Sequence, residues 1–290
     1  MGTVVHHRYA TVRGHRLFYR EAGSADLPTI VLLHGFPTSS FMFRNLIPQL
    51  AGYRVIAPDH LGFGLSDAPT VEEFDYSFDA LAELTHGLLE QLDVQRYAMV
   101  VHDYGAPIGW RLAIANPESV VAVISQNGNG YDEGFVPSGW APIWAYQRDP
   151  SSENEATLRG VFTLAAIRGQ YVTGVADESV LSPDTWTLDH AYLSRPGNAE
   201  VQLKLFADYV TNPPLYPALH QWLRDNQVPV LATWGKGDPF FGPEGARAFA
   251  RDTDKAEIHV MEGGHFLLES ACDEVAALIR EFLVKYLPAA

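Results

Sequence analysis

Residues 100–107 read VVHDYGAP, and this stretch decides the fold because an apolar segment runs there straight into a histidine and an aspartate. The residues before it, RYAMVV, are apolar or aromatic after the arginine, and those that follow, APIGWRLAIAN, have helical spacing. The pattern therefore predicts a buried strand, a turn and a helix, with Asp103 at the turn. A carboxylate in that place is either the N-cap of the helix or a nucleophile.

The same alternation of strands and helices surrounds this stretch. The continuous apolar runs at 29–33 and 120–125 are typical of strands buried on both faces of a parallel sheet, and 77–94 has the leucine spacing of an amphipathic helix. Helical spacing is also present at 41–51, and the first strand pair is expected to turn at Arg13-Gly14. The order of these elements predicts an α/β fold with a mostly parallel, doubly wound sheet.

The rhythm changes after about Asn129. Residues 130–227 are rich in Trp, Tyr and Pro, have mostly helical or irregular patterning and contain no continuous strand-like run. Strand and helix signals return from residue 228 onward. We therefore expect an α/β core formed by 1–129 and 228–290, interrupted by a helical cap at 130–227.

The composition is that of an ordinary globular protein with an acidic surface. Of the 290 residues, 47% are hydrophobic and 19% charged, and the formal net charge is -15. That charge disfavours nucleic acid and anionic membranes as partners, and the single cysteine, Cys272, permits no internal disulfide. Neither a signal peptide nor an apolar run long enough to span a bilayer is visible, so we expect a cytoplasmic protein, monomeric or homodimeric.

Three residues that can carry chemistry follow predicted strands. Asp103, Asp238 and His265 each come directly after a strand-like run, and in open α/β sheets sites form beyond the carboxyl ends of the strands. Each alone has a plainer explanation, as a helix cap, a turn residue or a hydrogen-bonded core histidine. Together they have the chain order nucleophile, acid, histidine, while no G-x-S-x-G motif occurs anywhere in the chain.

Five stretches extend this agreement along the chain: LLHGFP, PDHLGFGLSD, VHDYGAPIGWRLA, TWGKGDPFF and GGHFLLE. With them the sequence resembles the α/β-hydrolase fold family over essentially its full length. It looks most like the branch of epoxide hydrolases and haloalkane dehalogenases, whose nucleophile is an aspartate. One departure is Val101, which stands two residues before the nucleophile where the family usually has a small residue, whereas Gly105 matches the small residue two positions after it.

The resemblance implies a two-step mechanism without metal or cofactor, with a small molecule and water as partners. Asp103 is already ionised near neutral pH and can displace a leaving group from a saturated carbon, which gives an alkyl-enzyme ester. His265, held by Asp238, would then activate water against the ester. The backbone N–H groups of Phe36 and Tyr104 are expected to form the oxyanion hole.

The substrate class depends on residues around the nucleophile. Haloalkane dehalogenases typically have Trp after the nucleophile and often Asn after the HG pair, where this chain has Tyr104 and Phe36. Haloacetate dehalogenases have two arginines where this chain has Tyr104 and Pro107. Epoxide hydrolases often show HGFP, as found at 34–37. The resemblance therefore favours epoxide hydrolysis; a dehalogenase, or a binding protein that has lost turnover, remains as an alternative.

The cap should supply hydrogen-bond donors to the leaving group. Epoxide hydrolases use two cap tyrosines, and Tyr146 and Tyr209 lie about where these fall. A neutral phenol can donate one hydrogen bond to an opening oxirane. Trp140 and Trp144 are expected to line an apolar pocket or to donate indole N–H groups to a halide.

Overall fold

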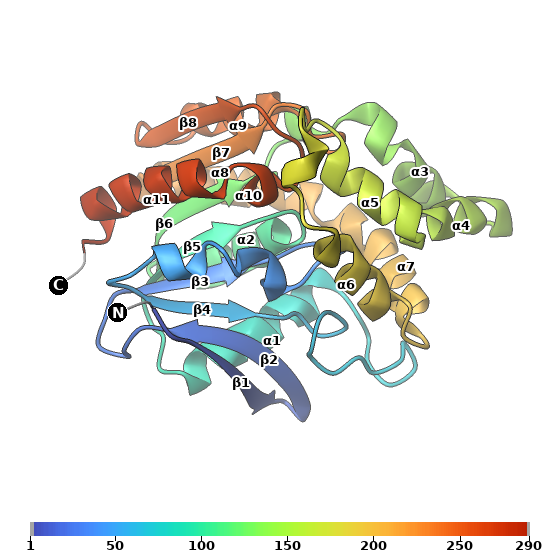
Figure 1. Cartoon of the computed structure of the whole chain (residues 1–290), viewed down its shortest axis with the longest axis horizontal. Helices are drawn as coiled ribbons and strands as arrows, with labels where there is room; N and C mark the ends of the chain where they lie inside the picture. The colour runs from blue at the N-terminus through green and yellow to red at the C-terminus, as the bar shows by residue number, and fades with distance from the viewer. Residues whose placement is uncertain (1–2, 289–290) are drawn as a thin grey trace.

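Eight strands form one sheet in the computed structural model, which describes residues 3–288 of the chain (Figure 1). Their order across the sheet is β1-β2-β4-β3-β5-β6-β7-β8. β1 (Val5–Val12) and β2 (His15–Ala22) form an antiparallel hairpin, and β2 is also antiparallel to β4. Arg13 and Gly14 make the hairpin turn with positive φ angles, as the sequence predicts.

The remaining strands are parallel, so their carboxyl ends meet at one edge. Listed in chain order, they are β3 (Thr29–Leu33), β4 (Arg54–Pro58), β5 (Tyr97–Val101), β6 (Val120–Gln126), β7 (Val230–Gly235) and β8 (Ala256–Met261). Every residue of β3, β4, β5 and β7 is buried. Burial on both faces explains why these segments are continuous apolar runs rather than alternating ones.

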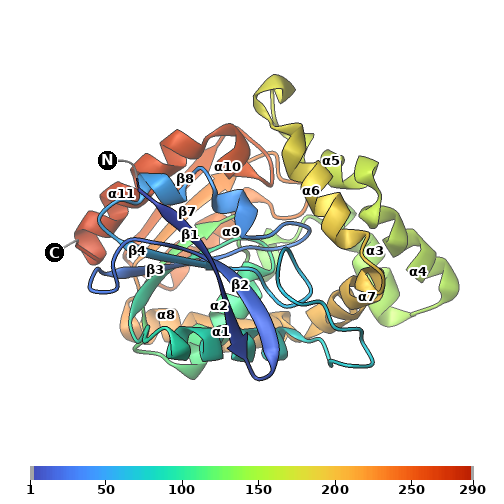
Figure 2. The same cartoon turned by 60° about the horizontal axis from the view of Figure 1, so that its bottom comes forward.

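Helices cover both faces of the sheet, as Figure 2 shows. On one face lie α1 (Phe78–Gln91), α2 (Gly105–Ala115), α8 (Tyr216–Asn226) and α9 (Pro243–Ala248); on the other lie α10 (Leu267–Ser270) and α11 (Cys272–Tyr286). The side-chain oxygen of Ser77 accepts the N–H of Ala80 and so caps α1. The doubly wound fold predicted from the sequence is confirmed.

The helix predicted at 41–51 is wrong. The chain forms two short 3-10 helices there, η1 (Ser40–Phe43) and η2 (Ile47–Gln49). Pro48 lies at the start of η2, and because proline has no backbone N–H and crowds the preceding turn, it disfavours a continuous α-helix there. The apolar spacing still buries Met42 and Leu46, so the pattern identified the buried face but not the type of helix.

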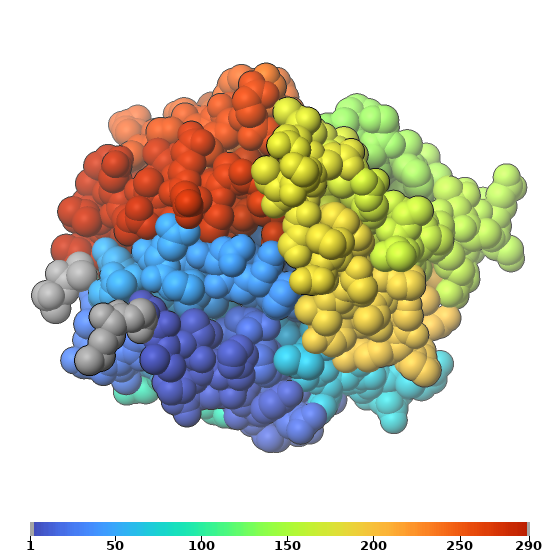
Figure 3. All heavy atoms as spheres, viewed as in Figure 1, coloured from blue at the N-terminus to red at the C-terminus, as the bar shows by residue number. Residues whose placement is uncertain are grey.

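Five helices extend over the carboxyl edge of the sheet and form the green to yellow part of the molecular surface in Figure 3. They are α3 (Pro137–Arg148), α4 (Ser152–Arg159), α5 (Leu164–Val172), α6 (Pro183–Leu193) and α7 (Asn198–Asp208). α8, the last element of the predicted cap, packs instead beside α2, and its Trp222 indole donates to the carbonyl of Pro117. The domain division at 130 and 227 therefore stays a prediction, with α8 on the core side.

Candidate active site

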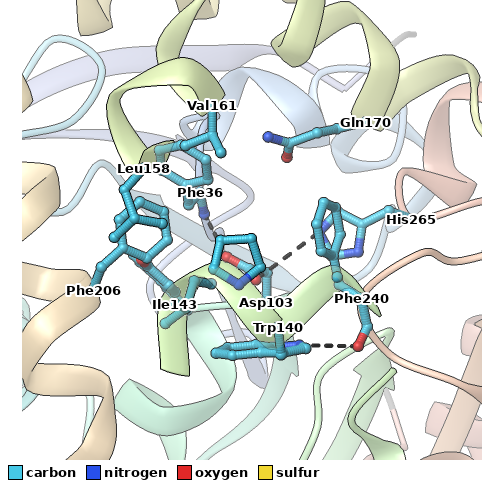
Figure 4. A pocket seen from close by; sticks show the side chains of 13 residues that line it. Phe36, Asp103, Trp140, Ile143, Leu158, Val161, Gln170, Phe206, Phe240 and His265 are labelled. Carbon is cyan, nitrogen blue, oxygen red and sulfur yellow. Dashed lines mark hydrogen bonds and ion pairs between the residues drawn. The ribbon is translucent and has the colours of Figure 1, made fainter. Parts of the chain in front are cut away.

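Asp103 lies in the turn between β5 and α2, and its backbone has the left-handed φ of 47°. That conformation is rare for residues other than glycine and is maintained only where the surroundings enforce it. The turn needs a glycine at 105, because a Cβ there would collide with the carbonyl oxygen of Leu33. The sharp turn points the carboxylate away from the sheet and into a cavity under the cap (Figure 4).

Val101 fits at this position because the residues packed against its side chain are glycines. A Cβ on Gly109 of α2 would lie 2.8 Å from Cγ1 of Val101, and one on Gly128 would lie 2.9 Å from Cγ2. Both distances are shorter than real Cβ contacts, so the two glycines leave the room that the valine methyl groups fill. Glycines on α2 and after β6 thus compensate for the departure from the family pattern.

The Asp103 carboxylate is buried but has hydrogen-bond donors. Its Oδ1 accepts the backbone N–H of Phe36 at 2.6 Å, and the N–H of Tyr104 also bonds to the carboxylate. Burial raises the pKa of Asp103 to about 6, since desolvation outweighs the opposing effects of His265 and the two N–H groups. The carboxylate is therefore ionised at neutral pH, beside the two N–H groups expected to form the oxyanion hole.

His265 lies between the two carboxylates. Its Nδ1 is 2.8 Å from Oδ2 of Asp238, and its Nε2 is 4.0 Å from Oδ2 of Asp103. Burial lowers the pKa of His265, but Asp238, the hydrogen bond to it and Asp103 together raise that pKa above its ordinary value. When Nδ1–H faces Asp238, Nε2 is free to take a proton from a molecule beside Asp103.

Asn127 and Gln126, at the end of β6, hold this pair in place. The Asn127 amide donates to Oδ2 of Asp238 at 2.7 Å, and its oxygen accepts the N–H of Gly235 at 2.9 Å. The Gln126 amide donates to the carbonyl of His265 at 3.0 Å. Sequence analysis gave neither residue a role, although their position directly after a buried strand is the same signal that identified Asp103.

Two other histidines near the site brace loops. Nε2 of His34 accepts the N–H of His60 at 3.0 Å, and burial lowers the pKa of His34 to about 4, so its imidazole is neutral. Nδ1 of His102 lies 3.1 Å from the carbonyl of Gln126, and burial lowers the pKa of His102 well below its ordinary value. Both rings link neighbouring strand ends by hydrogen bonds that need no charge.

A small, mostly apolar cavity opens above Asp103 (Figure 4). The space open to the centre of a water molecule is about 70 Å³, which corresponds to roughly five water molecules. Core, cap and catalytic residues all contribute to its walls: Phe36, Asp103, Tyr104, Gly139, Trp140, Pro142, Ile143, Leu158, Val161, Gln170, Phe206, Phe240 and His265. The cavity therefore suits a small apolar molecule held close to the nucleophile.

Of the four cap side chains expected at the substrate, Trp140 is the one that lines the cavity. Its indole N–H already donates to the carbonyl of Phe240 at 3.0 Å. The ring of Tyr209 packs behind it, with 4.4 Å between ring centroids, and is not part of the cavity wall. Trp144 and Tyr146, half-buried on α3, also lie outside the wall.

Gln170 on α5 is a polar cavity residue that sequence analysis missed. It lies in a short helix of the predicted cap, and the spacing of apolar residues in this helix does not indicate which of its polar residues is buried. The structure places it 7% exposed in the cavity wall. Within residues 3–288 no cluster of three or more metal-ligating side chains occurs, and no helix is both long and apolar enough to cross a bilayer.

Comparisons with known proteins identify the fold family. A family model described as the alpha/beta hydrolase fold matches residues 28–271. An uncharacterized hydrolase of Saccharomyces cerevisiae is 42% identical over 282 residues, covering 96% of this chain and 95% of that protein. A haloalkane dehalogenase of Mesorhizobium japonicum is 30% identical over 280 residues, covering 91% and 87%.

Solved structures give the same fold. Cfl2 from Burkholderia cenocepacia superposes with a TM-score of 0.80 at 26% identity, covering 97% of this chain and 96% of Cfl2. The epoxide hydrolase CorEH has a TM-score of 0.79 at 23% identity, covering 97% of this chain and 99% of CorEH. At that identity the likeness to CorEH concerns the fold and not the substrate.

Proposed function

This chain belongs to the α/β-hydrolase fold family and is a hydrolase, and we propose that it hydrolyses small apolar epoxides through an alkyl ester on Asp103. The observation that carries the proposal is the setting of that carboxylate. One oxygen accepts the N–H of Phe36 at 2.6 Å, and the other lies 4.0 Å from Nε2 of His265. A buried, ionised carboxylate with one oxygen free toward an apolar cavity suits attack on carbon.

In the first step, an oxygen of Asp103 forms a bond to one oxirane carbon. The carbon–oxygen bond of the strained ring breaks, and its electron pair stays on the departing oxygen. The cavity wall is mostly apolar and Asp103 is buried, so the carboxylate is poorly solvated before the substrate binds. No general base is needed for this step, because the nucleophile carries its charge already.

In the second step, His265 takes a proton from water, and the resulting hydroxide adds to the ester carbonyl of Asp103. The tetrahedral oxyanion accepts hydrogen bonds from the N–H groups of Phe36 and Tyr104, which already bond to the carboxylate. Its collapse breaks the bond between the acyl carbon and the alcohol oxygen, which takes up a proton, so that the diol leaves and the carboxylate of Asp103 is restored. Asp238 stabilises the charged imidazole across the 2.8 Å hydrogen bond. Ester formation removes the charge of Asp103, which lowers the pKa of His265 just when it acts as a base.

Epoxides come first among the substrates because the cavity wall offers no free indole. Tyr104 follows the nucleophile, and the Trp140 indole N–H is bonded to Phe240. A phenol, Tyr209, packs against both of these rings, with centroid distances of 5.9 Å to Tyr104 and 4.4 Å to Trp140. We assign Tyr209, Tyr146 and Trp144 to packing around the cavity, because none of them lines its wall.

Haloalkanes are the second candidate class. The full-length identity of 30% to a haloalkane dehalogenase supports this candidate, since the same ester chemistry expels a halide without any acid. A binding protein without turnover is disfavoured, because Asp103, Asp238 and His265 have the distances that both steps need.

The test is to trap the ester. His265→Ala should form the ester and fail to hydrolyse it, which adds the mass of the substrate to the peptide containing Asp103. The matched control is the double variant that also carries Asp103→Asn, which should gain no mass. The panel contains small epoxides and small haloalkanes; an adduct with epoxides alone supports the first class, one with haloalkanes alone the second, and none with either refutes the ester.

A further inference from the structure

We propose that Gln170 binds the oxirane oxygen as it leaves the carbon attacked by Asp103, an inference that rests on the proposed ester mechanism. Gln170 is 7% exposed, and among the hydrogen bonds of residues 3–288 none involves its side-chain amide. Figure 4 shows that amide directed into the cavity, between Val161 and His265. A side-chain amide that faces an apolar cavity without a protein partner is free to bond a molecule that enters the cavity.

The other polar side chains of the cavity wall are already committed. The Trp140 indole donates to Phe240, while Asp103 and His265 carry out the two steps. The Tyr104 hydroxyl is fully shielded, and its ring packs edge-on against Phe78 with 5.0 Å between centroids. Within the described cavity wall, Gln170 is therefore the polar side chain left to contact the substrate.

The end of α5 is fixed against the loops that carry the catalytic residues. Tyr171, the next residue, stacks on Phe266 with 3.9 Å between ring centroids and an interplanar angle of 8°. A Cβ on Gly237 would lie 2.6 Å from the Cα of Gly174, and one on Gly264 would collide with the carbonyl of Thr173. Contacts this close leave α5 little freedom to move relative to His265.

This anchoring gives Gln170 a defined position before the substrate arrives. A donor that is already in place stabilises developing charge without the cost of reorganising during the reaction. The oxirane oxygen gains negative charge only as its bond to the attacked carbon breaks, so the hydrogen bond strengthens in the transition state of ester formation. Ester hydrolysis happens at the carbonyl of Asp103 and should depend on Gln170 far less.

An amide N–H donates a hydrogen bond but does not give up its proton. The released alkoxide therefore takes its proton from water, which leaves hydroxide. When the ester is later hydrolysed, the proton that His265 removes from water neutralises an equivalent of hydroxide, so the net reaction is epoxide plus water to diol. Gln170 thus binds the leaving oxygen without being consumed or charged.

The experiment measures ester formation with 1,2-epoxybutane in the His265→Ala protein, by quenching at timed intervals and weighing the peptide that contains Asp103. Adding Gln170→Met, which keeps the length of the side chain but removes the donor, should slow ester formation about 10- to 100-fold. In protein with His265 intact, the rate of ester hydrolysis should change by no more than about twofold. A purely structural role of Gln170 would slow both steps or neither.

Two further variants complete the test. Gln170→Glu has the same shape and, when ionised, repels the alkoxide, so at pH 8 it should slow ester formation at least as much as Gln170→Met. The matched control is Gln147→Met, because this cap glutamine donates to the carbonyl of Phe206 at 2.9 Å and does not line the cavity. It should form the ester at close to the parent rate.

The outcomes separate this inference from the proposed function. If Gln170→Met and Gln170→Glu form the ester as fast as the parent, Gln170 does not bind the leaving oxygen, although the ester mechanism stands. If the His265→Ala parent forms no ester at all, the mechanism fails and the role of Gln170 fails with it. Slower ester formation with unchanged hydrolysis supports the role.

Discussion

Replacing Asp103 by asparagine should stabilise the protein at pH 8 while abolishing turnover. The carboxylate is buried, and its pKa is raised from 3.8 to about 6. A raised pKa means that the folded protein favours the neutral acid, so its contribution to stability is full below pH 3.8 and is lost as the pH rises through about 6. Asparagine stays neutral at every pH, and its side-chain oxygen can still accept the hydrogen bond from the N–H of Phe36.

The size of the effect follows from the same two pKa values. The pKa of Asp103 rises from 3.8 to about 6 on folding. At about 1.4 kcal/mol for each pKa unit, this difference corresponds to about 3 kcal/mol of folding free energy. Asp103→Asn should therefore unfold with a free energy about 3 kcal/mol higher than the parent at pH 8. At pH 4 the gain should fall well below 1 kcal/mol, because there the parent carboxylate is mostly protonated in the folded state.

The assay is urea unfolding of both proteins at half-unit steps from pH 4 to pH 8. In the variant, His265 loses the neighbouring charge of Asp103. Because that charge raises the pKa of His265, the parent alone gains extra stability where Asp103 is ionised and His265 is protonated, and it loses this gain as the pH rises further. This contribution has the same sign as that of Asp103, and repeating the comparison with His265→Gln in both proteins removes it. A gain that is equal at pH 4 and pH 8, or a variant less stable at pH 8, would refute the reasoning.

Three further predictions concern the same residues. Asp238→Asn should accumulate the ester by mass while its hydrolysis slows about 10⁴-fold, because both Asp238 oxygens accept N–H groups and an amide nitrogen would face a donor on either side; hydrolysis at the parent rate would contradict this. Single-turnover ester formation should rise with pH through about 6 and then level off, since Asp103 attacks as the carboxylate; a flat profile between pH 5 and 8 would count against it. Tyr104→Phe should raise the free energy of unfolding by about 1 kcal/mol in urea titrations, because it removes a buried hydroxyl without a partner; a loss of stability would mean that the hydroxyl has a partner.

The approach of the three candidate catalytic residues to one another could be predicted because it follows from the sheet. Asp103, Asp238 and His265 each follow a parallel strand, and parallel strands bring their carboxyl ends to one edge. The register pairs Val101 of β5 with Ser125 of β6, so residues far apart in sequence are brought together by strand order alone. A single sequence that places a residue directly after a parallel strand therefore also predicts where that residue lies in the fold.

The cap allows no such inference. Its helices are short, and whether Trp140 or Tyr209 reaches the cavity depends on how each helix rotates against its neighbours, which aromatic content does not determine. Gln170 occupies one helical position among ordinary polar ones, so its burial becomes visible only once α5 is docked. The failed helix at 41–51 has a local cause, Pro48, that the sequence did contain.

The candidate site reduces the stability of the folded chain through a few groups that have a strained backbone or lack full hydrogen bonding. Asp103 has a left-handed backbone and a raised pKa, and Tyr104 and His102 each bury an unpaired polar atom. The side-chain amide of Gln170 has no protein partner and faces the cavity. Asp103, Tyr104 and Gln170 line that cavity, and each leaves a polar group incompletely satisfied there. A substrate oxygen bound by Gln170 and an ester formed on Asp103 would relieve two of them at once. Stability gained by substituting either residue should therefore come with a loss of ester formation.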